Sequence, residues 1–407
     1  MQVAITNGHV VPGAGAPELP AADVLVEDGV IVAVGAGAAT GSAGEVIDAT
    51  GLVVVPGLVD THHHVAQAPL RGTGADLTLP AYLDTVIGRY LPAYRPQDVR
   101  LATLLGALES LDAGITTVLD WAEPTKTPEH TDAVVAGLTA AGIRAVVGHT
   151  APGDEDDVRR LAARTGLVTG AVASLGPEWG TWEQAVHDIE LARELGVPVT
   201  IHAQGGGADP VVPRLHAAGL LGPDLLLVHL NAATDEDVQL LVAAGVGVAV
   251  SPCVEPLMGH GTAPYGRFTD AGGRVALAVD VVINAAPDLF EPMRDVLRAE
   301  RVRTGRMVPA ASLLAAATEH GAAALGMADR IGTIAPGKRA DLLLVDGLSH
   351  VEPGTAAGAV VATAGPAQVR TVLVDGHVVK RDGRLVGHDL DAVRAEAAEL
   401  AVRVRAA

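Results

Sequence analysis

The sequence predicts an α/β fold in which a (β/α)8 barrel is combined with a small composite β-sandwich domain built from both termini. Two observations predict it. Short apolar runs alternate with helical windows through the middle of the chain, whereas both ends show period-two patterns broken by turn signals. A length of 407 residues is enough for one large barrel with an appended domain.

The two ends of the chain have the same pattern. Residues 1–56 contain alternating apolar runs separated by Asn-Gly, Asp-Gly and Gly pairs, which indicate hairpins. Residues 336–388 repeat it, and residues 389–407 are typical of an amphipathic helix. We expect the first two segments to form one composite β domain, followed by a C-terminal helix.

The middle of the chain, residues 57–335, contains eight strand candidates with helix-like stretches between most of them. In order they are "LVVVPGLVDTH", "ITTVLD", "RAVVGHT", "GAVASLG", "VPVTIHA", "DLLLVHL", "GVGVAVSP" and "RVALAVD". Nearly continuous apolar strands that alternate with helices indicate a parallel sheet, and eight such units predict a closed barrel.

Composition narrows the classes of function. The formal net charge of −20 argues against a nucleic-acid partner, because binding phosphates requires clustered Lys and Arg. A single cysteine, Cys253, indicates a reducing, cytoplasmic setting. No window approaches the roughly 18 continuous apolar residues of a membrane span, so we expect a soluble protein that acts on a small-molecule substrate.

Polar residues end several of the predicted strands, at the barrel face where active sites form. They are His62, His64, His202, His229 and Asp280. Because side chains two apart in an extended segment face the same way, His62 and His64 can both point to the barrel axis while His63 points away. A cluster of histidines and one carboxylate at separate strand ends predicts a metal site.

The ligand types indicate which metal and which chemistry. Imidazole nitrogen and carboxylate oxygen suit Zn²⁺ or Fe²⁺, and three histidines with one carboxylate leave a coordination position for water. Metal-bound water reaches a pKa near 7 and becomes a hydroxide nucleophile, with His229 or Asp280 as candidates to take its proton. We therefore expect one divalent metal, with zinc favoured over iron, and a hydrolytic reaction.

These motifs occur in the order found in a known family. From "VVVPGLVDTHHH" to "GTIAPGKRADLLLVD", nearly the whole chain resembles the amidohydrolase superfamily. Within it, the chain is similar to the aminohydrolase and chlorohydrolase subgroup, which includes guanine, 8-oxoguanine and cytosine deaminases and triazine hydrolases.

The resemblance implies roles for individual residues. It assigns metal binding to His62, His64, His202 and Asp280, and a hydrogen bond to the metal water or the substrate to His229. Members with two metals bridge them with a Lys after strand four, and no Lys occurs between Lys126 and Lys338, so a mononuclear site is expected. A homodimer is also compatible with the resemblance.

Two residues after the first strand resemble substrate contacts of the subgroup. Gln67 is similar to the Gln that contacts a purine ring, although a loop-capping amide would look the same. Arg71 in "PLRG" resembles a residue that could pair with an anionic or carbonyl group, although it could equally anchor the loop.

One departure from the pattern concerns proton transfer. The deaminases read His-x-x-Glu at strand five, where the Glu moves a proton between water and a ring nitrogen, but position 205 here is Gly205. General acid–base help is worth typically about 10²–10⁴-fold, so a replacement is expected. Glu255 and His260 are the candidate acids, and Gln204 is a candidate substrate contact.

The leading hypothesis is a metal-dependent hydrolase that cleaves a C–N bond of a small cyclic, nucleobase-like substrate by hydrolytic deamination. The missing Glu favours, as an alternative, an amide or lactam hydrolase. A metal-assisted lyase or decarboxylase is an alternative of another class, because it needs no such shuttle.

Overall fold

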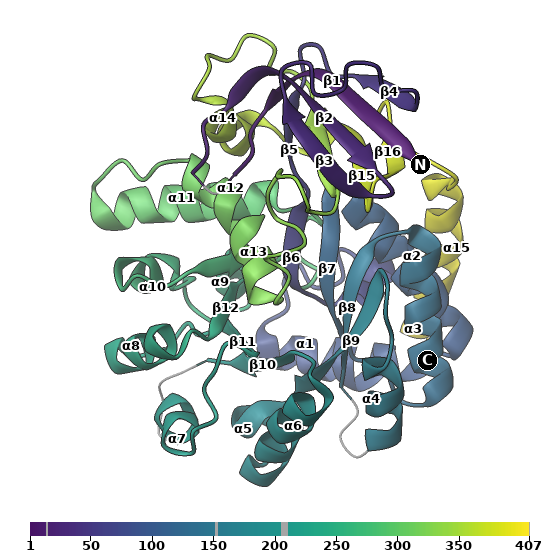
Figure 1. Cartoon of the computed structure of the whole chain (residues 1–407). Helices are drawn as coiled ribbons and strands as arrows, with labels where there is room; N and C mark the ends of the chain where they lie inside the picture. Colours follow the sequence, from purple (N-terminus) through teal and green to yellow (C-terminus); the bar gives the residue numbers. More distant parts are fainter. Residues whose placement is uncertain (14, 151–153, 205–210, 407) are drawn as a thin grey trace.

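The computed structural model describes residues 1–13, 15–150, 154–204 and 211–406. It consists of a barrel and a smaller β domain to which both ends of the chain contribute (Figure 1). The expected boundary at residues 56 and 57 lies between strand β5, Val53–Pro56, and strand β6, Leu58–His63.

Eight parallel strands form the barrel, in the spatial order β6 to β13 without a crossover. The seven that follow β6 are β7 Ile115–Ala122, β8 Arg144–His149, β9 Val168–Ser174, β10 Val199–Ala203, β11 Leu225–His229, β12 Gly247–Val250 and β13 Val275–Leu277. An isolated parallel bridge between His63 and Asp280 joins the last strand region to the first and closes the ring. The predicted barrel is thus confirmed, and its eight strands coincide with the eight apolar runs.

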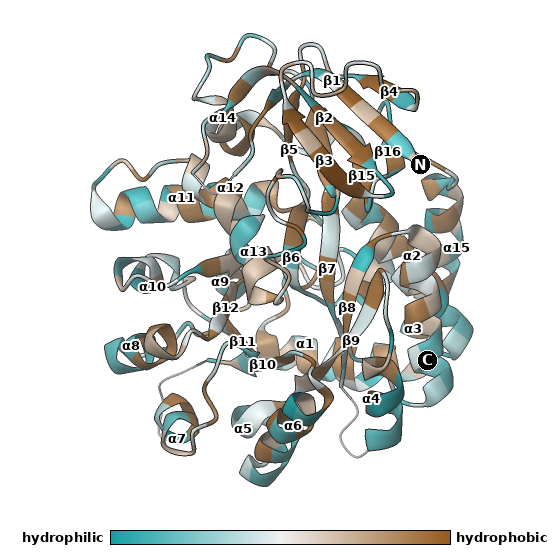
Figure 2. Cartoon of the chain, viewed as in Figure 1, coloured by the Kyte–Doolittle hydropathy of each residue, from teal (hydrophilic) through white to brown (hydrophobic). Residues whose placement is uncertain are grey.

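Helices surround the strands on the outside of the barrel, with their polar faces outward (Figure 2). The longer ones are α2 Pro96–Asp112, α3 Pro128–Ala141, α4 Glu155–Ala162, α6 Trp182–Leu195, α7 Val211–Ala217, α8 Asp235–Ala244, α10 Tyr265–Asp270 and α11 Phe290–Thr304. Three short helices, α1 Leu79–Tyr82, α5 Gly176–Trp179 and α9 Val254–Leu257, follow strands or lie near their carboxyl ends.

The barrel interior is filled with apolar side chains at its amino-terminal end. Val59, Leu119, Val146 and Leu226 point inward from four strands and pack against Ile331, which follows helix α13, Glu319–Ala324. A filled core is the rule for barrels of eight strands. Because apolar side chains fill this end, the interior has room for a pocket at the opposite, carboxyl end.

The composite domain is a nine-stranded mixed sheet with the path β17-β16-β15-β14-β5-β1-β2-β3 and with β4 paired to β1. Its remaining strands are β1 Gln2–Val10, β2 Leu19–Glu27, β3 Val30–Gly35, β4 Glu45–Asp48, β14 Leu342–Val345, β15 Val369–Val374, β16 His377–Arg381 and β17 Arg384–Leu385. Helix α12, Ala311–Ala316, precedes β14 along the chain, and helix α14, Ala356–Thr363, lies between β14 and β15. Helix α15, Leu390–Arg405, follows β17.

One expected hairpin turn in this domain is wrong. Asp28-Gly29 and Asp375-Gly376 do lie at turns between paired strands, but strand β1 continues through Asn7-Gly8. There the register against β2 shifts between Ile5 and Gly8, and Asn7 adopts a φ of 60°. An Asn-Gly pair supplies the left-handed conformation that a bulge needs as readily as the one that a turn needs.

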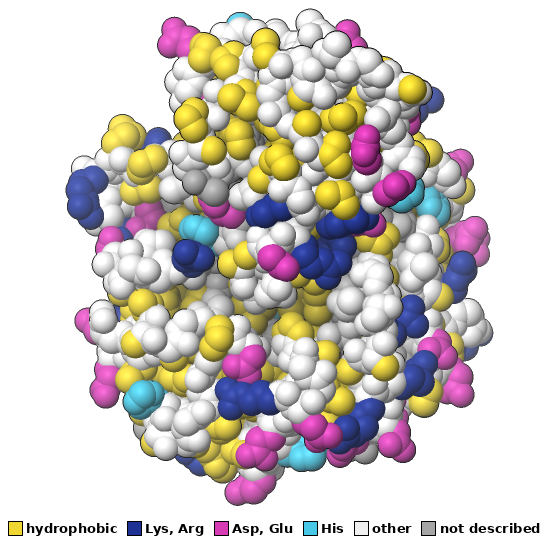
Figure 3. All heavy atoms as spheres, viewed as in Figure 1, with side chains coloured by type: hydrophobic (Ala, Val, Ile, Leu, Met, Phe, Trp, Pro, Cys, Tyr) yellow, Lys and Arg dark blue, Asp and Glu magenta, His cyan; other side chains and the backbone are white. Residues whose placement is uncertain are grey.

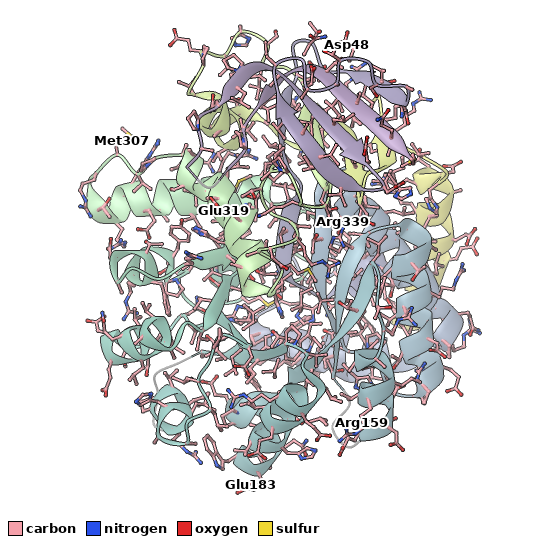
Figure 4. All side chains as sticks on the ribbon, viewed as in Figure 1. Asp48, Arg159, Glu183, Met307, Glu319 and Arg339 are labelled. Carbon is pink, nitrogen blue, oxygen red and sulfur yellow. The ribbon has the colours of Figure 1, made fainter. Side chains whose placement is uncertain are left out.

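A buried ion-pair cluster joins the barrel to the composite domain. Arg144 of β8 is 2% exposed and donates to both carboxylate oxygens of Asp341, at 2.7 and 2.9 Å, and to Asp375 at 2.8 Å. Arg339, labelled in Figure 4, adds a second cation on Asp375. Buried charges of this kind are stable only when every partner is present.

Replacing Arg144 with Met should lower the free energy of unfolding by about 3–5 kcal/mol, because Asp341 would be left as an unpaired buried charge. Urea unfolding measures the change. Arg159→Met is the matched control, since Arg159 is half-exposed and pairs only with surface carboxylates; its effect should stay within about 1 kcal/mol. Equal effects of the two replacements would contradict the assigned role of Arg144.

Basic and acidic side chains are interspersed over the face shown in Figure 3. Among the described residues, no helix has both the length and the hydropathy that crossing a bilayer would require.

Candidate active site

The five polar residues that end barrel strands lie in one cluster, as two triads that share His62. The Nε2 atoms of His62 and His202 lie 3.1 Å apart, and the Oδ1 atom of Asp280 lies 3.5 Å from His62 Nε2 and 3.3 Å from His64 Nε2. Donor atoms of His62, His202 and His229 also lie within 4.8 Å of one another. The structure therefore brings together every residue that was expected to bind the metal.

His63, the middle histidine of the run, faces away from this cluster as expected. It is fully buried, and its Nδ1 lies 2.9 Å from Oδ2 of Asp60. The other oxygen of Asp60 accepts the backbone N–H of Val279, on the segment that leads to Asp280. His63 and Asp60 thus hold the first and last strand regions together beneath the cluster.

The backbone is strained where the polar side chains leave the strands. His229, Leu230 and Asp280 have φ values of 80°, 55° and 67°, in the left-handed region that non-glycine residues rarely adopt. Such conformations persist only where the surrounding structure enforces them, and they concentrate at functional sites.

The electrostatics of the cluster suit a bound cation. Burial lowers the pKa of His62 to about 3 and that of His202 well below its usual value, so both imidazoles are neutral and keep a lone pair. Burial opposes ionisation of Asp280, yet hydrogen bonds from His62 and His64 outweigh it and keep its pKa well below the usual range. Two neutral nitrogens 3.1 Å apart beside a buried carboxylate would be stabilised by a divalent metal.

A further carboxylate, Glu123, contacts this cluster from behind. Its Oε1 is paired with Nδ1 of His64 and accepts a hydrogen bond from Nε2 of Gln67 at 2.9 Å. Burial disfavours the charged form of His64, but the charge of Glu123 outweighs it and raises the pKa of His64 to about 10. A carboxylate on Nδ1 fixes the ring so that Nε2 faces the metal position, which is the usual arrangement around histidine ligands.

Gln67 is fully buried, and its amide also donates to the hydroxyl of Tyr82 at 2.7 Å. Gln67 therefore orients Glu123. Its expected contact with substrate stays a prediction, which these hydrogen bonds do not favour.

Glu255 is held behind His229. It is fully buried, and its Oε1 lies 3.2 Å from His229 Nδ1 while accepting the backbone N–H of Ser251 at 2.8 Å. Burial opposes protonation of His229, but the hydrogen bond to Glu255 and the charge of Asp280 outweigh it and raise its pKa. Glu255 acts on the site through His229, so we propose a positioning role for it in place of direct acid catalysis.

His260 is the other expected acid, and it lies at the pocket. The amide of Gln204 lies 3.1 Å from His260 Nδ1, and the imidazole ring of His260 lies 5.4 Å from that of His229. His260 Nε2 is buried and has no partner among the described residues. The Gly205 position, where the deaminase Glu is missing, lies outside the described residues.

These residues form the floor of a cavity of about 180 Å³ at the carboxyl end of the barrel. Its polar lining consists of His64, Tyr82, Glu123, His202, Gln204, His229, His260 and Asp280. Trp121 forms one side, with its ring 4.0 Å from that of His202. The rest of the lining is apolar.

Arg71 does not line this cavity. Its guanidinium binds both oxygens of Glu109 and faces a neighbouring cavity of about 500 Å³, together with Cys253. Burial raises the pKa of Cys253, so it remains a thiol. The expected contact of Arg71 with substrate stays a prediction that this geometry does not favour.

Sequence reasoning missed two residues of the site, Trp121 and Glu123. Both follow the run "ITTVLD" at the end of β7, the same kind of position as the predicted ligands. Extending the search for polar strand ends by three residues would have found Glu123.

Three comparisons with known proteins all indicate the amidohydrolase family. The model of the amidohydrolase family matches residues 53–379. A 5-methylthioadenosine/S-adenosylhomocysteine deaminase of Desulforudis audaxviator is 32% identical, over 99% of each chain, and a 5'-deoxyadenosine deaminase of Methanosarcina mazei is 30% identical, over 98% and 97%. A structure of an adenosine deaminase from Xanthomonas campestris with bound zinc has a TM-score of 0.89 and 26% identity, covering 100% of this chain and 99% of that one.

Proposed function

Because the chain belongs to the amidohydrolase family, we propose that it is a metal-dependent hydrolase that removes the amino group of a small, nucleobase-like heterocycle. The observation that carries the proposal is the cluster of His62, His64, His202, His229 and Asp280, all of which except His62 line one pocket. Relatives that are named as deaminases of adenosine-type compounds support the amino group as the group that leaves.

A divalent metal is the cofactor of this family, and we propose zinc, with iron as the alternative. His62, His64, His202 and Asp280 would hold it, and Glu123 would orient His64 through Nδ1. When bound, such an ion lowers the pKa of water so that hydroxide is available near neutral pH.

His229 is proposed to handle a proton at the attacking water. Glu255 accepts the Nδ1 proton of His229, so Nε2 is left as an acceptor. Nε2 can then take a proton from water at the floor of the pocket or hydrogen-bond the substrate.

His260 is proposed to deliver the proton that the absent Glu would supply. Because the Gln204 amide donates to His260 Nδ1, the ring proton lies on Nε2. Burial lowers the pKa of His260, so the imidazolium that forms when the ring takes up a proton is a stronger acid than usual and returns to neutral imidazole when Nε2 donates. A proton from this atom to the departing amine or a ring nitrogen completes deamination.

Replacing His260 with Asn should lower kcat about 10²-fold and remove one limb of the pH–rate profile, because a general acid is lost, while the metal content stays unchanged. His216→Asn on α7 is the matched control, since His216 is exposed. An unchanged rate and pH profile for His260→Asn would exclude His260 as the acid.

The proposed function is tested by incubating the protein with aminated purines, their nucleosides, aminopyrimidines and cyclic amides, and measuring ammonia and product mass. We expect ammonia together with exchange of an amino group for a hydroxyl. The absence of the strand-five Glu at position 205 favours one second candidate, amide or lactam hydrolysis. Opening of a cyclic amide would add a whole water without releasing ammonia and would overturn the deaminase proposal.

A further inference from the structure

The wall of the pocket above the polar floor is apolar. Leu79, Leu83 and Ile87 come from helix α1 and the π-helical segment Leu83–Tyr90, Leu175 and Trp179 from the end of β9 and from α5, and Met258 from the residue after α9. These six side chains surround whatever part of a bound molecule extends outward from the reacting ring. They offer it no hydrogen-bond partner except the indole N–H of Trp179.

Two of these side chains are exposed at the mouth. Leu175 is 38% exposed and Trp179 is 45% exposed, although large apolar side chains are normally covered. Binding becomes more favourable when an apolar group of a ligand covers such an exposed apolar pair at the rim of a pocket.

The pocket has two carboxylates in its lining, Glu123 and Asp280, and no Lys or Arg among the residues that the structure describes. The segments outside the description, 151–153 and 205–210, contain no Lys or Arg in the sequence either. Arg71 is the basic residue nearest along the chain to His62 and His64. Its two terminal guanidinium nitrogens each donate to one oxygen of Glu109.

We propose that this pocket selects neutral amino-heterocycles that carry an apolar substituent and rejects those whose substituent ends in a carboxylate or phosphate. The proposal rests on the proposed deamination and names its substrate class. An anionic end would lose its hydration against Leu83, Ile87 and Trp179 and gain no cation in return. An apolar end of the same shape would bury surface there instead.

The test compares two adenosines of similar size, one with an apolar and one with an anionic substituent. Their 5' positions carry an S-isobutyl or an S-carboxymethyl group, which have the same branched shape. We expect kcat/KM for the S-isobutyl compound to exceed that for the S-carboxymethyl compound by about 10²-fold or more, since unpaired charge and lost apolar contact act together. Comparable values for the two compounds would overturn the proposal and leave deamination standing.

A variant tests the wall itself. Leu175→Arg places a cation at the exposed rim, where folding does not depend on the side chain, and should raise kcat/KM for the S-carboxymethyl compound about 10-fold while lowering that for the S-isobutyl compound. Met307→Arg is the matched control, because Met307 is 78% exposed after helix α11, far from the pocket (Figure 4). Identical selectivity of Leu175→Arg and the wild-type protein would contradict the proposal.

Binding measurements distinguish failure of the proposed deamination from failure of the proposed selectivity. If neither adenosine releases ammonia, the proposed function fails, and calorimetry with the same two compounds still compares their affinities. Tighter binding of the S-isobutyl compound supports the apolar wall as the selective element. Equal or weaker binding, or no binding of either compound, overturns it.

Discussion

Replacing Asp280 with Asn is expected to abolish turnover, with a loss of about 10⁴-fold or more, because the metal that makes hydroxide available near neutral pH would no longer be held. Asp280 supplies the only carboxylate of the predicted ligand set, and its Oδ1 lies within 3.5 Å of both His62 and His64 Nε2. An amide oxygen carries no charge to offset a divalent ion between neutral imidazoles.

The same experiment measures the metal. Elemental analysis of the wild-type protein should find about one zinc or iron per chain, since the ligand set describes a single ion. Asp280→Asn should contain almost none, and Asp346→Asn, a surface carboxylate paired with Arg370, should match the wild type. A stoichiometry near two, or full metal and full activity in Asp280→Asn, would contradict the assigned site.

Replacing His229 with Gln is expected to lower kcat by about 10²–10⁴-fold while the metal is retained, because a residue that handles the proton of water is lost and the ligands remain. The pH–rate profile should lose the limb that reports this base. Loss of metal from His229→Gln would show instead that His229 is a ligand. Its donor atom lies close enough to those of His62 and His202 for it to share an ion with them.

Glu255 supplies a control for the role of His229. Glu255→Gln should lower kcat by about 10–100-fold in the wild-type background, as loss of a residue that orients an imidazole does. In the His229→Gln background the same change should have almost no further effect, because the two residues act as one unit. Additive losses would contradict the positioning role of Glu255.

The barrel and the clustering of the polar strand-end residues could be predicted because both depend on local pattern. Eight apolar runs imply eight strands, and side-chain alternation is enough to separate His62 and His64 from His63. The turn expected at Asn7-Gly8 is instead a bulge within β1, because one backbone conformation serves a turn and a bulge alike.

Contacts between distant segments could not be predicted. The pairing of Glu123 with His64 and the role of Glu255 behind His229 depend on how neighbouring strands align, to within a residue. Arg144 and Asp341 are 197 residues apart, and nothing in either local sequence indicates that they meet. The missing strand-five Glu was visible in the sequence, whereas the position of His260 beside Gln204 required the structure.

The central claim is hydrolysis of a C–N bond by water at the His62, His64, His202 and Asp280 site. It is tested most directly by running the reaction in ¹⁸O-labelled water with an aminated purine nucleoside and measuring ammonia and product mass together. We predict one labelled oxygen in the product for each ammonia released, and neither in Asp280→Asn. A product formed without label would contradict hydrolysis and favour a lyase or decarboxylase reaction.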